Sequence, residues 1–147
     1  MKKTTITFLF LFSILLCFSQ DNSNVVGEWY TEDKEAVITI FVEKDKTLSG
    51  KTTWMKEPVD SDGNPKLDKL NPDKELRSRK RLGLKIMHGF KYKGENTWED
   101  GRIYKPTNGK TYGGKAILID SNTLELEGYL LSLPFIGKSS TWTRKLD

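Results

Sequence analysis

Short alternations of apolar and polar residues run along most of the chain and are separated by turn-forming residues. The clearest is at 123–129, where Leu124 and Leu126 alternate with glutamates. A period of two sends successive side chains to opposite faces of a strand, so this pattern predicts a strand with one buried face. Similar segments, rich in β-branched and aromatic residues, predict seven more strands, at 27–30, 36–43, 48–55, 84–92, 98–104, 112–120 and 139–145.

The segment 98–114 predicts two of these strands and the tight turn between them. The turn contains Asn108-Gly109, and both residue types tolerate positive φ, which makes the pair a strong hairpin signal. The period of two places Trp98, Asp100, Arg102 and Tyr104 on one face of the first strand, with Tyr112 of the second strand beside them. If that face is internal, Asp100 and Arg102 form either a polar clamp for a ligand or a structural ion pair.

Eight short strands with short links and no long helix predict an all-β protein. We expect an eight-stranded antiparallel up-and-down barrel of lipocalin-like form, with a sandwich as the other arrangement of such strands. One long loop, 57–81, interrupts the pattern with three prolines and the basic run 77–81. Within it, Asn71-Pro72 predicts a short helical turn. The loop is either a solvated cover over one barrel end or a functional surface.

We expect the more apolar face of each strand to point inward. This choice lets all four tryptophans point inward and places His88 inside beside Phe90. A small barrel lined in this way is either a packed core or a pocket for one small ligand. The candidate ligand-binding residues are Trp29, Trp54, His88, Phe90, Trp98, Asp100, Arg102, Tyr104, Tyr112, Trp142 and Arg144.

Candidate chemistry beyond binding is sparse. His88 is the only histidine, and a metal site needs further nitrogen or sulfur ligands, so we expect no metal centre. Asp60, Asp62 and Asn64 alternate as calcium ligands do, but the closing glutamate is missing. An enzyme could use His88 with Asp100, yet no nucleophile, catalytic or cofactor motif accompanies them. We therefore expect a protein without catalytic residues or a cofactor.

The N-terminal segment, 1–19, predicts a secretory signal peptide. Lys2 and Lys3 precede an apolar run that is too short to span a membrane, and small residues allow cleavage after Ser19. Acylation of Cys17 as a lipoprotein is the alternative. We expect a single barrel domain at 20–147, secreted to the periplasm or the exterior, with no transmembrane span.

Composition then limits the possible partners. Cys17 is the only cysteine and leaves with the signal peptide, so no disulfide is expected. The formal net charge of +4 falls by two when Lys2 and Lys3 are removed, which gives no support to nucleic-acid binding. We expect a monomer. The apolar connection 130–137 is expected to be a lid or plug for the barrel mouth, or a contact for a membrane or partner.

Gly27-x-Trp29 together with Trp142-x-Arg144 resembles the lipocalin and calycin barrels. The resemblance implies that the tryptophan of the first strand packs against the arginine of the last strand and closes the barrel base. More of the chain resembles the bacterial secreted family catalogued as domain of unknown function 2147. The segments that carry this likeness are 27–29, 62–65, 81–90, 98–106, 109–112, 126–129 and 137–144.

These observations together predict a secreted lipocalin-like protein that binds a small apolar or amphipathic ligand in the cell envelope. Aromatic walls with a few polar groups are typical of such binding sites. The alternative is a structural or interaction module that binds an envelope partner through the basic loop 57–81 and the apolar segment 130–137.

Overall fold

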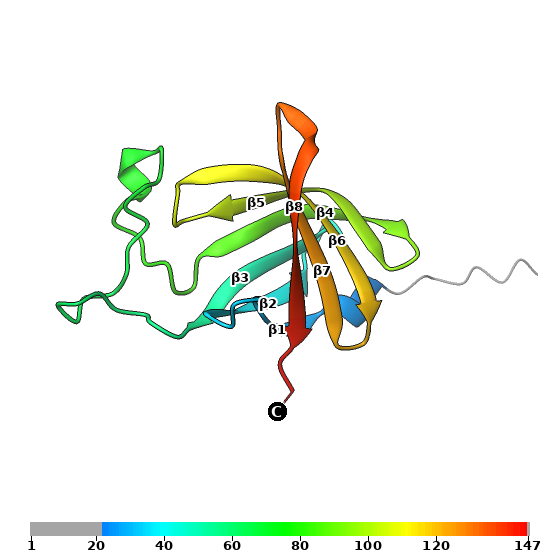
Figure 1. Ribbon diagram of the computed structural model, residues 1–147, viewed down its shortest axis with the longest axis horizontal. Helices are drawn as coiled ribbons and strands as arrows, with labels where there is room; N and C mark the ends of the chain where they lie inside the picture. The colour runs from blue at the N-terminus through cyan, green and yellow to red at the C-terminus, as the bar shows by residue number, and fades with distance from the viewer. Residues whose placement is uncertain (1–21, 147) are drawn as a thin grey trace, which may run out of the picture.

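The structure is a computed structural model that describes residues 22–146. The predicted signal peptide, with Cys17, lies outside the described residues. Within them, eight antiparallel strands form a closed barrel in chain order (Figure 1). The strands are β1 (Gly27–Tyr30), β2 (Ala36–Val42), β3 (Leu48–Met55), β4 (Lys85–Gly94), β5 (Thr97–Lys105), β6 (Lys110–Asp120), β7 (Thr123–Leu130) and β8 (Leu133–Arg144). The predicted up-and-down barrel is confirmed.

A single apolar cluster occupies the barrel interior. Its buried members are Val25, Trp29, Ile38, Ile40, Leu48, Met87, Phe90, Trp98, Ala116, Leu118, Leu124, Leu126 and Trp142. The ring of Phe90 fills the space over Gly101 and Gly114, where an added Cβ would lie 2.4 and 2.5 Å from ring atoms. Packing this close makes the aromatic residues here part of the core.

One end of the barrel is closed by Arg144 and the short 3-10 helix η1 (Asn22–Val25). The Arg144 guanidinium lies 4.2 Å from the centroid of the Trp29 ring. It donates hydrogen bonds to the carbonyl oxygens of Asn24 (2.7 Å), Val26 (2.9 Å) and Ser121 (2.5 Å). Arg144 therefore joins β8, η1 and the β6–β7 turn, and the closure implied by the resemblance is confirmed.

Gly27 is required at this closure for two reasons. Its φ of 135° lies in a region that residues with a side chain rarely adopt, and an added Cβ would lie 2.8 Å from a guanidinium nitrogen of Arg144. The sequence motif thus reflects a close approach of backbone and guanidinium.

β-bulges reverse the faces of β4 and β5 partway along each strand. Between β3 and β4 the pairs Leu48–Phe90 and Gly50–Met87 leave one extra residue on β4. Met87 and Phe90 consequently both point inward, and His88 is exposed. An extra residue transfers every following side chain to the opposite face. The prediction that His88 lies inside the barrel is wrong for this reason.

The β5 bulge has the same effect on Asp100 and Arg102. Between β5 and β6 the pairs Trp98–Ala116 and Gly101–Gly114 leave an extra residue on β5, and Asp100 has a φ of 61°. Asp100 and Arg102 are both exposed, so the predicted internal pair is wrong. Asp100 instead forms an ion pair with Lys93 at 3.0 Å.

A third register shift moves Trp54 to the outside. Val37 pairs with Trp54 and Ile38 with Thr52, which leaves Thr53 as the additional residue. Trp54 is 45% exposed and meets Tyr30 edge-on on the outer wall, with ring centroids 6.3 Å apart. The prediction that all four tryptophans point inward holds for the other three only.

The long loop between β3 and β4 lies against β5 and the β5–β6 turn. Its 3-10 helix η2 (Lys74–Leu76) begins beyond Asp73, whose side chain accepts a hydrogen bond from the Glu75 N–H. The predicted short helical turn is therefore present, two residues beyond Pro72. At Gly109, with a φ of 70°, an added Cβ would lie 1.9 Å from the Leu70 carbonyl oxygen, so this turn requires glycine.

The apolar segment 130–137 is neither a lid nor a plug. β8 begins at Leu133, six residues earlier than predicted, and pairs with β7 as far as Leu130–Leu133. The resulting hairpin projects from the barrel (Figure 1, orange). The sequence prediction failed because an apolar run without polar alternation does not show the period of two.

Candidate functional site

A buried carboxylate holds the long loop against the outer wall of the barrel. Asp68 is fully buried. Its oxygens accept hydrogen bonds from the hydroxyl of Tyr104 (2.5 Å), the amide of Asn71 (2.8 Å) and Nε of Arg79 (3.0 Å). A buried carboxylate is tolerated only when it is paired and hydrogen-bonded, as it is here.

Tyr104 reaches this cluster because of the β5 bulge. It lies on the same face of β5 as Arg102, outside the barrel, yet it is only 8% exposed because the loop covers it. Asn71 also donates to the Tyr104 hydroxyl, at 3.1 Å. The cluster is therefore a link between loop and barrel wall.

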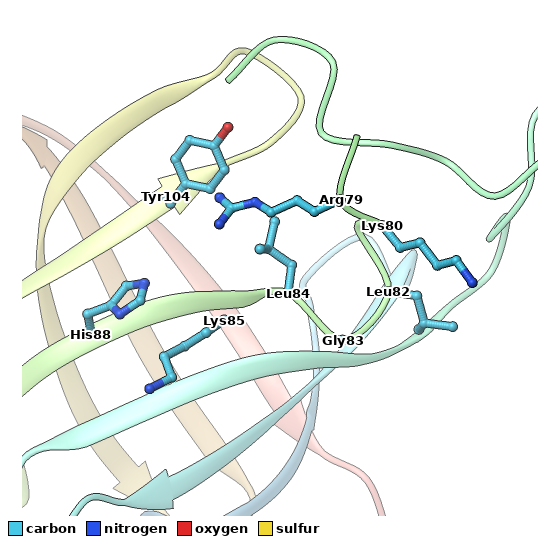
Figure 2. Close-up of a pocket in the computed structure, with 8 residues that line it drawn as sticks. All are labelled: Arg79, Lys80, Leu82, Gly83, Leu84, Lys85, His88 and Tyr104. Carbon is cyan, nitrogen blue, oxygen red and sulfur yellow. The ribbon is translucent and has the colours of Figure 1, made fainter. Parts of the chain in front are cut away.

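Beside this link is a surface cavity of about 570 Å³ that is largely open to solvent. Its lining comes from the last residues of the loop and from the outer faces of β4 and β5 (Figure 2). The lining residues are Arg79, Lys80, Leu82, Gly83, Leu84, Lys85, His88 and Tyr104. This volume is within the usual range for small-molecule sites.

Two of the lining cations are held in place by carboxylates that lie outside the lining. Arg79 forms an ion pair with Asp68 at 3.0 Å, and Lys85 forms one with Glu43 at 2.6 Å. Figure 2 shows Arg79 extending from the loop towards Tyr104 and His88. Arg79 and Lys85 are thus positioned before any ligand arrives, which reduces the entropy cost of binding.

The titrating groups respond to this environment. Loss of hydration lowers the pKa of His88, and the charges of Lys85 and Arg79 also act to lower it. Burial raises the pKa of Tyr104, and its bond to Asp68 adds to the effect. Burial alone would raise the pKa of Asp68, but the hydrogen bonds it accepts outweigh burial and lower that pKa. At neutral pH the cavity therefore contains a neutral imidazole, a neutral phenol and cations.

The cavity combines two kinds of surface. Leu84, which is 8% exposed, and the more exposed Leu82 supply an apolar wall, while Arg79, Lys80 and Lys85 supply positive charge. Among residues 22–146, no carboxylate belongs to this lining. Such a surface suits a small molecule with an anionic group and a short apolar part.

The predicted site residues do not form one site. Trp29, Phe90, Trp98 and Trp142 are core residues inside the barrel. Tyr112 and Arg144 are half-buried, and Arg144 belongs to the closed base. Trp54, Asp100 and Arg102 are on the outside and away from the cavity lining. Of the eleven, His88 and Tyr104 alone line the cavity.

Sequence reasoning missed most of the lining. Arg79 and Lys80 belong to the basic run 77–81, which the sequence indicates only as part of a loop that is a solvated cover or a functional surface. Leu84 and Lys85 were included in the predicted fourth strand without a role. Asp68 sits in irregular sequence, where no periodicity indicates burial.

Further limits come from the described part of the chain. Between residues 22 and 146, no group of three or more histidine, cysteine, aspartate or glutamate side chains could hold a metal ion. The same residues contain no helix with the length and hydropathy needed to cross a bilayer.

The closed eight-stranded barrel with its arginine-closed base defines a lipocalin-like protein. The chain matches, over residues 27–144, the family described as "Uncharacterized protein conserved in bacteria (DUF2147)". It belongs to this family. A comparison with curated proteins finds no match.

A solved structure supports the same fold. The chain is similar to protein HP1028 from the human pathogen Helicobacter pylori, which is described as belonging to the lipocalin family. The two share 25% sequence identity, the match covers 83% of each chain, and the TM-score is 0.70.

Proposed function

We propose that this protein binds a small amphipathic anion in the cavity between the long loop and β4–β5. The observation that carries the proposal is the lining itself, which among the described residues combines cations held by ion pairs with an apolar wall and includes no carboxylate. A lipocalin-like fold is compatible with small-ligand binding. The binding position differs from the one expected from sequence, since the barrel interior holds a packed apolar cluster.

The proposed place of action is the bacterial cell envelope. The support is the N-terminal sequence, with Lys2 and Lys3 before an apolar run and small residues near Ser19. Short-chain amphiphiles with carboxylate or phosphate groups are a ligand class that this surface would recognise.

Calorimetric titration with decanoate, and with decanol and butyrate as comparisons, tests the proposal. Decanoate should bind more tightly than either, because it satisfies both the cations and the apolar wall. Lys85→Met should weaken decanoate binding about tenfold, since one charge-assisted contact is lost. Lys91→Met, on an exposed part of the same strand, is the matched control and should leave affinity unchanged.

Two results would count against the proposal. One is equal affinity for decanoate in the Lys85→Met and Lys91→Met variants. The other is binding of decanol as tight as that of decanoate, which would assign the affinity to apolar contact alone.

A second candidate function is an interaction module for an envelope partner. The observation that favours it is the exposed apolar hairpin at 130–137. The basic loop contributes less than expected, because Arg79 lines the cavity and Arg81 donates to the Leu67 carbonyl oxygen at 2.9 Å. Capture of an envelope protein that is lost in Phe135→Asp would support this candidate.

A further inference from the structure

The tip of the β7–β8 hairpin, residues 130–136, exposes five large apolar side chains in a short segment. They are Leu130, Leu131, Leu133, Phe135 and Ile136, and Phe135 is 83% exposed. Single exposed apolar residues are normal on protein surfaces, but a contiguous group marks an interaction site.

The tip stands clear of the barrel. The last pair between β6 and β7 is Gly113–Tyr129, and β8 pairs with β1 only at Tyr30–Thr143 and Trp29–Arg144. The tip strands are therefore paired with each other alone, and Figure 1 shows them projecting beyond the neighbouring strands. Leu130 and the turn residues Leu131 and Ser132 extend the hairpin roughly 7–10 Å beyond Tyr129, at about 3.3 Å per residue.

The tip has an irregular outline. Tyr129 pairs with Gly137 and Leu130 with Leu133, so Pro134, Phe135 and Ile136 have no opposite residues on β7. A protein partner would need a groove that matches this outline. A fluid apolar medium adapts to it and can cover all the exposed apolar side chains.

The residues directly below the tip suit a boundary between water and lipid. Tyr129 pairs with Gly137, and Lys138 follows on β8. Tyrosine is enriched where membranes meet water, and lysine can place its stem in an apolar layer while its charge stays hydrated.

From these features we infer that the hairpin tip inserts into the surface layer of a lipid bilayer. Its length of roughly 7–10 Å matches the depth to which interfacial elements enter, about 5–10 Å. A second copy of the chain is a poorer occupant, because a stable dimer needs about 20–30 residues from each side. The inference is independent of the cavity and its ligand.

Co-sedimentation with vesicles of phosphatidylethanolamine and phosphatidylglycerol tests the inference on protein that begins at residue 20. Phe135→Asp should lower the partition coefficient at least tenfold, because a charged side chain replaces one buried in lipid. Ile119→Asp is the matched control. Ile119 is 57% exposed on β6, outside the tip, and its substitution should change partitioning by less than twofold.

A site-specific label adds a readout that does not depend on affinity. The segment that begins at residue 20 contains no cysteine, so one can be introduced at Ser132 in the tip turn or at Ser121 in the β6–β7 turn. An environment-sensitive fluorophore at position 132 should shift to the blue and be quenched by nitroxide-labelled lipids. The same fluorophore at position 121 should show neither effect.

Three results would overturn the inference. The unchanged protein could fail to sediment with vesicles, or Phe135→Asp and Ile119→Asp could partition equally. Ultracentrifugation could instead show a dimer that Phe135→Asp dissociates, which would assign the tip to a second copy.

Discussion

Replacement of Arg144 by alanine tests how the barrel base is held together. The side chain donates to three carbonyl oxygens, at 2.5, 2.7 and 2.9 Å, and its guanidinium stacks on Trp29. Each of the three hydrogen bonds from this charged donor contributes about 1 kcal/mol to the free energy of unfolding. The value is modest because water can partly rehydrate the carbonyl oxygens when the side chain is removed. The cation–π contact adds about 1 kcal/mol.

Arg144→Ala should therefore lower the free energy of unfolding by about 4 kcal/mol. For a domain of this size that corresponds to a fall in Tm of roughly 12–16 °C. Urea titration followed by circular dichroism measures the free energy, and scanning calorimetry measures Tm. Arg144→Lys keeps the charge and loses the planar fork, so it should lose about 2 kcal/mol.

Arg102→Ala is the control for this experiment. Arg102 is exposed and donates only to nearby carbonyl oxygens of its own strand, so its loss should cost less than about 0.5 kcal/mol. If Arg144→Ala and Arg102→Ala proved equally stable, the proposed role of Arg144 in closing the base would be refuted.

Three further predictions concern the cavity, the loop and the N-terminus. The NMR titration of His88 should have a midpoint below 6.5, and a midpoint above 6.5 would contradict this prediction. The free energy of unfolding should fall as the pH drops through the midpoint, because the unfolded chain binds the proton more tightly than the folded protein. Asp68→Asn should cost about 3 kcal/mol by urea titration and Tyr104→Phe about 1 kcal/mol, and equal losses would contradict the central place of the carboxylate. Mass spectrometry of the exported protein should find Gln20 at the N-terminus, whereas an acylated Cys17 would show the lipoprotein alternative.

The strand pattern and the base closure could be predicted from sequence because they depend on local periodicity and on a short motif. Leu124 and Leu126 alternate with glutamates and are buried as expected. Trp29 and Arg144 are in contact as the resemblance implied. The turn at Asn108-Gly109 is likewise a local feature.

The facing of individual side chains could not be predicted in the same way. A bulge is a property of two paired strands, and nothing in 84–92 alone shows that Gly89 adds a residue before Phe90. Predictions that applied the period of two across a bulge were wrong. The bulges place His88, Asp100 and Arg102 on the outside of the barrel. Tyr104 was also placed on the wrong face, although the loop buries it.

The cavity depends on contacts between distant segments. Asp68 and Tyr104 are 36 residues apart and meet only when the loop folds back on β5. Irregular sequence such as 57–81 has no period that would reveal which side chain is buried. The sequence indicated 130–137 as an apolar connection that is a lid, a plug or a contact for a membrane or partner. Its pairing as a hairpin was not predicted, since an apolar run without polar alternation does not show the period of two.

The most direct test of the account is an NMR titration of the His88 ring with decanoate. His88 is the only histidine, so its ring signals report on the cavity without overlap in untagged protein. The account predicts saturable shifts of these signals and a rise in the His88 pKa, because a bound anion favours the imidazolium form. Ring signals and a pKa that stay unchanged at saturating decanoate would contradict binding in this cavity.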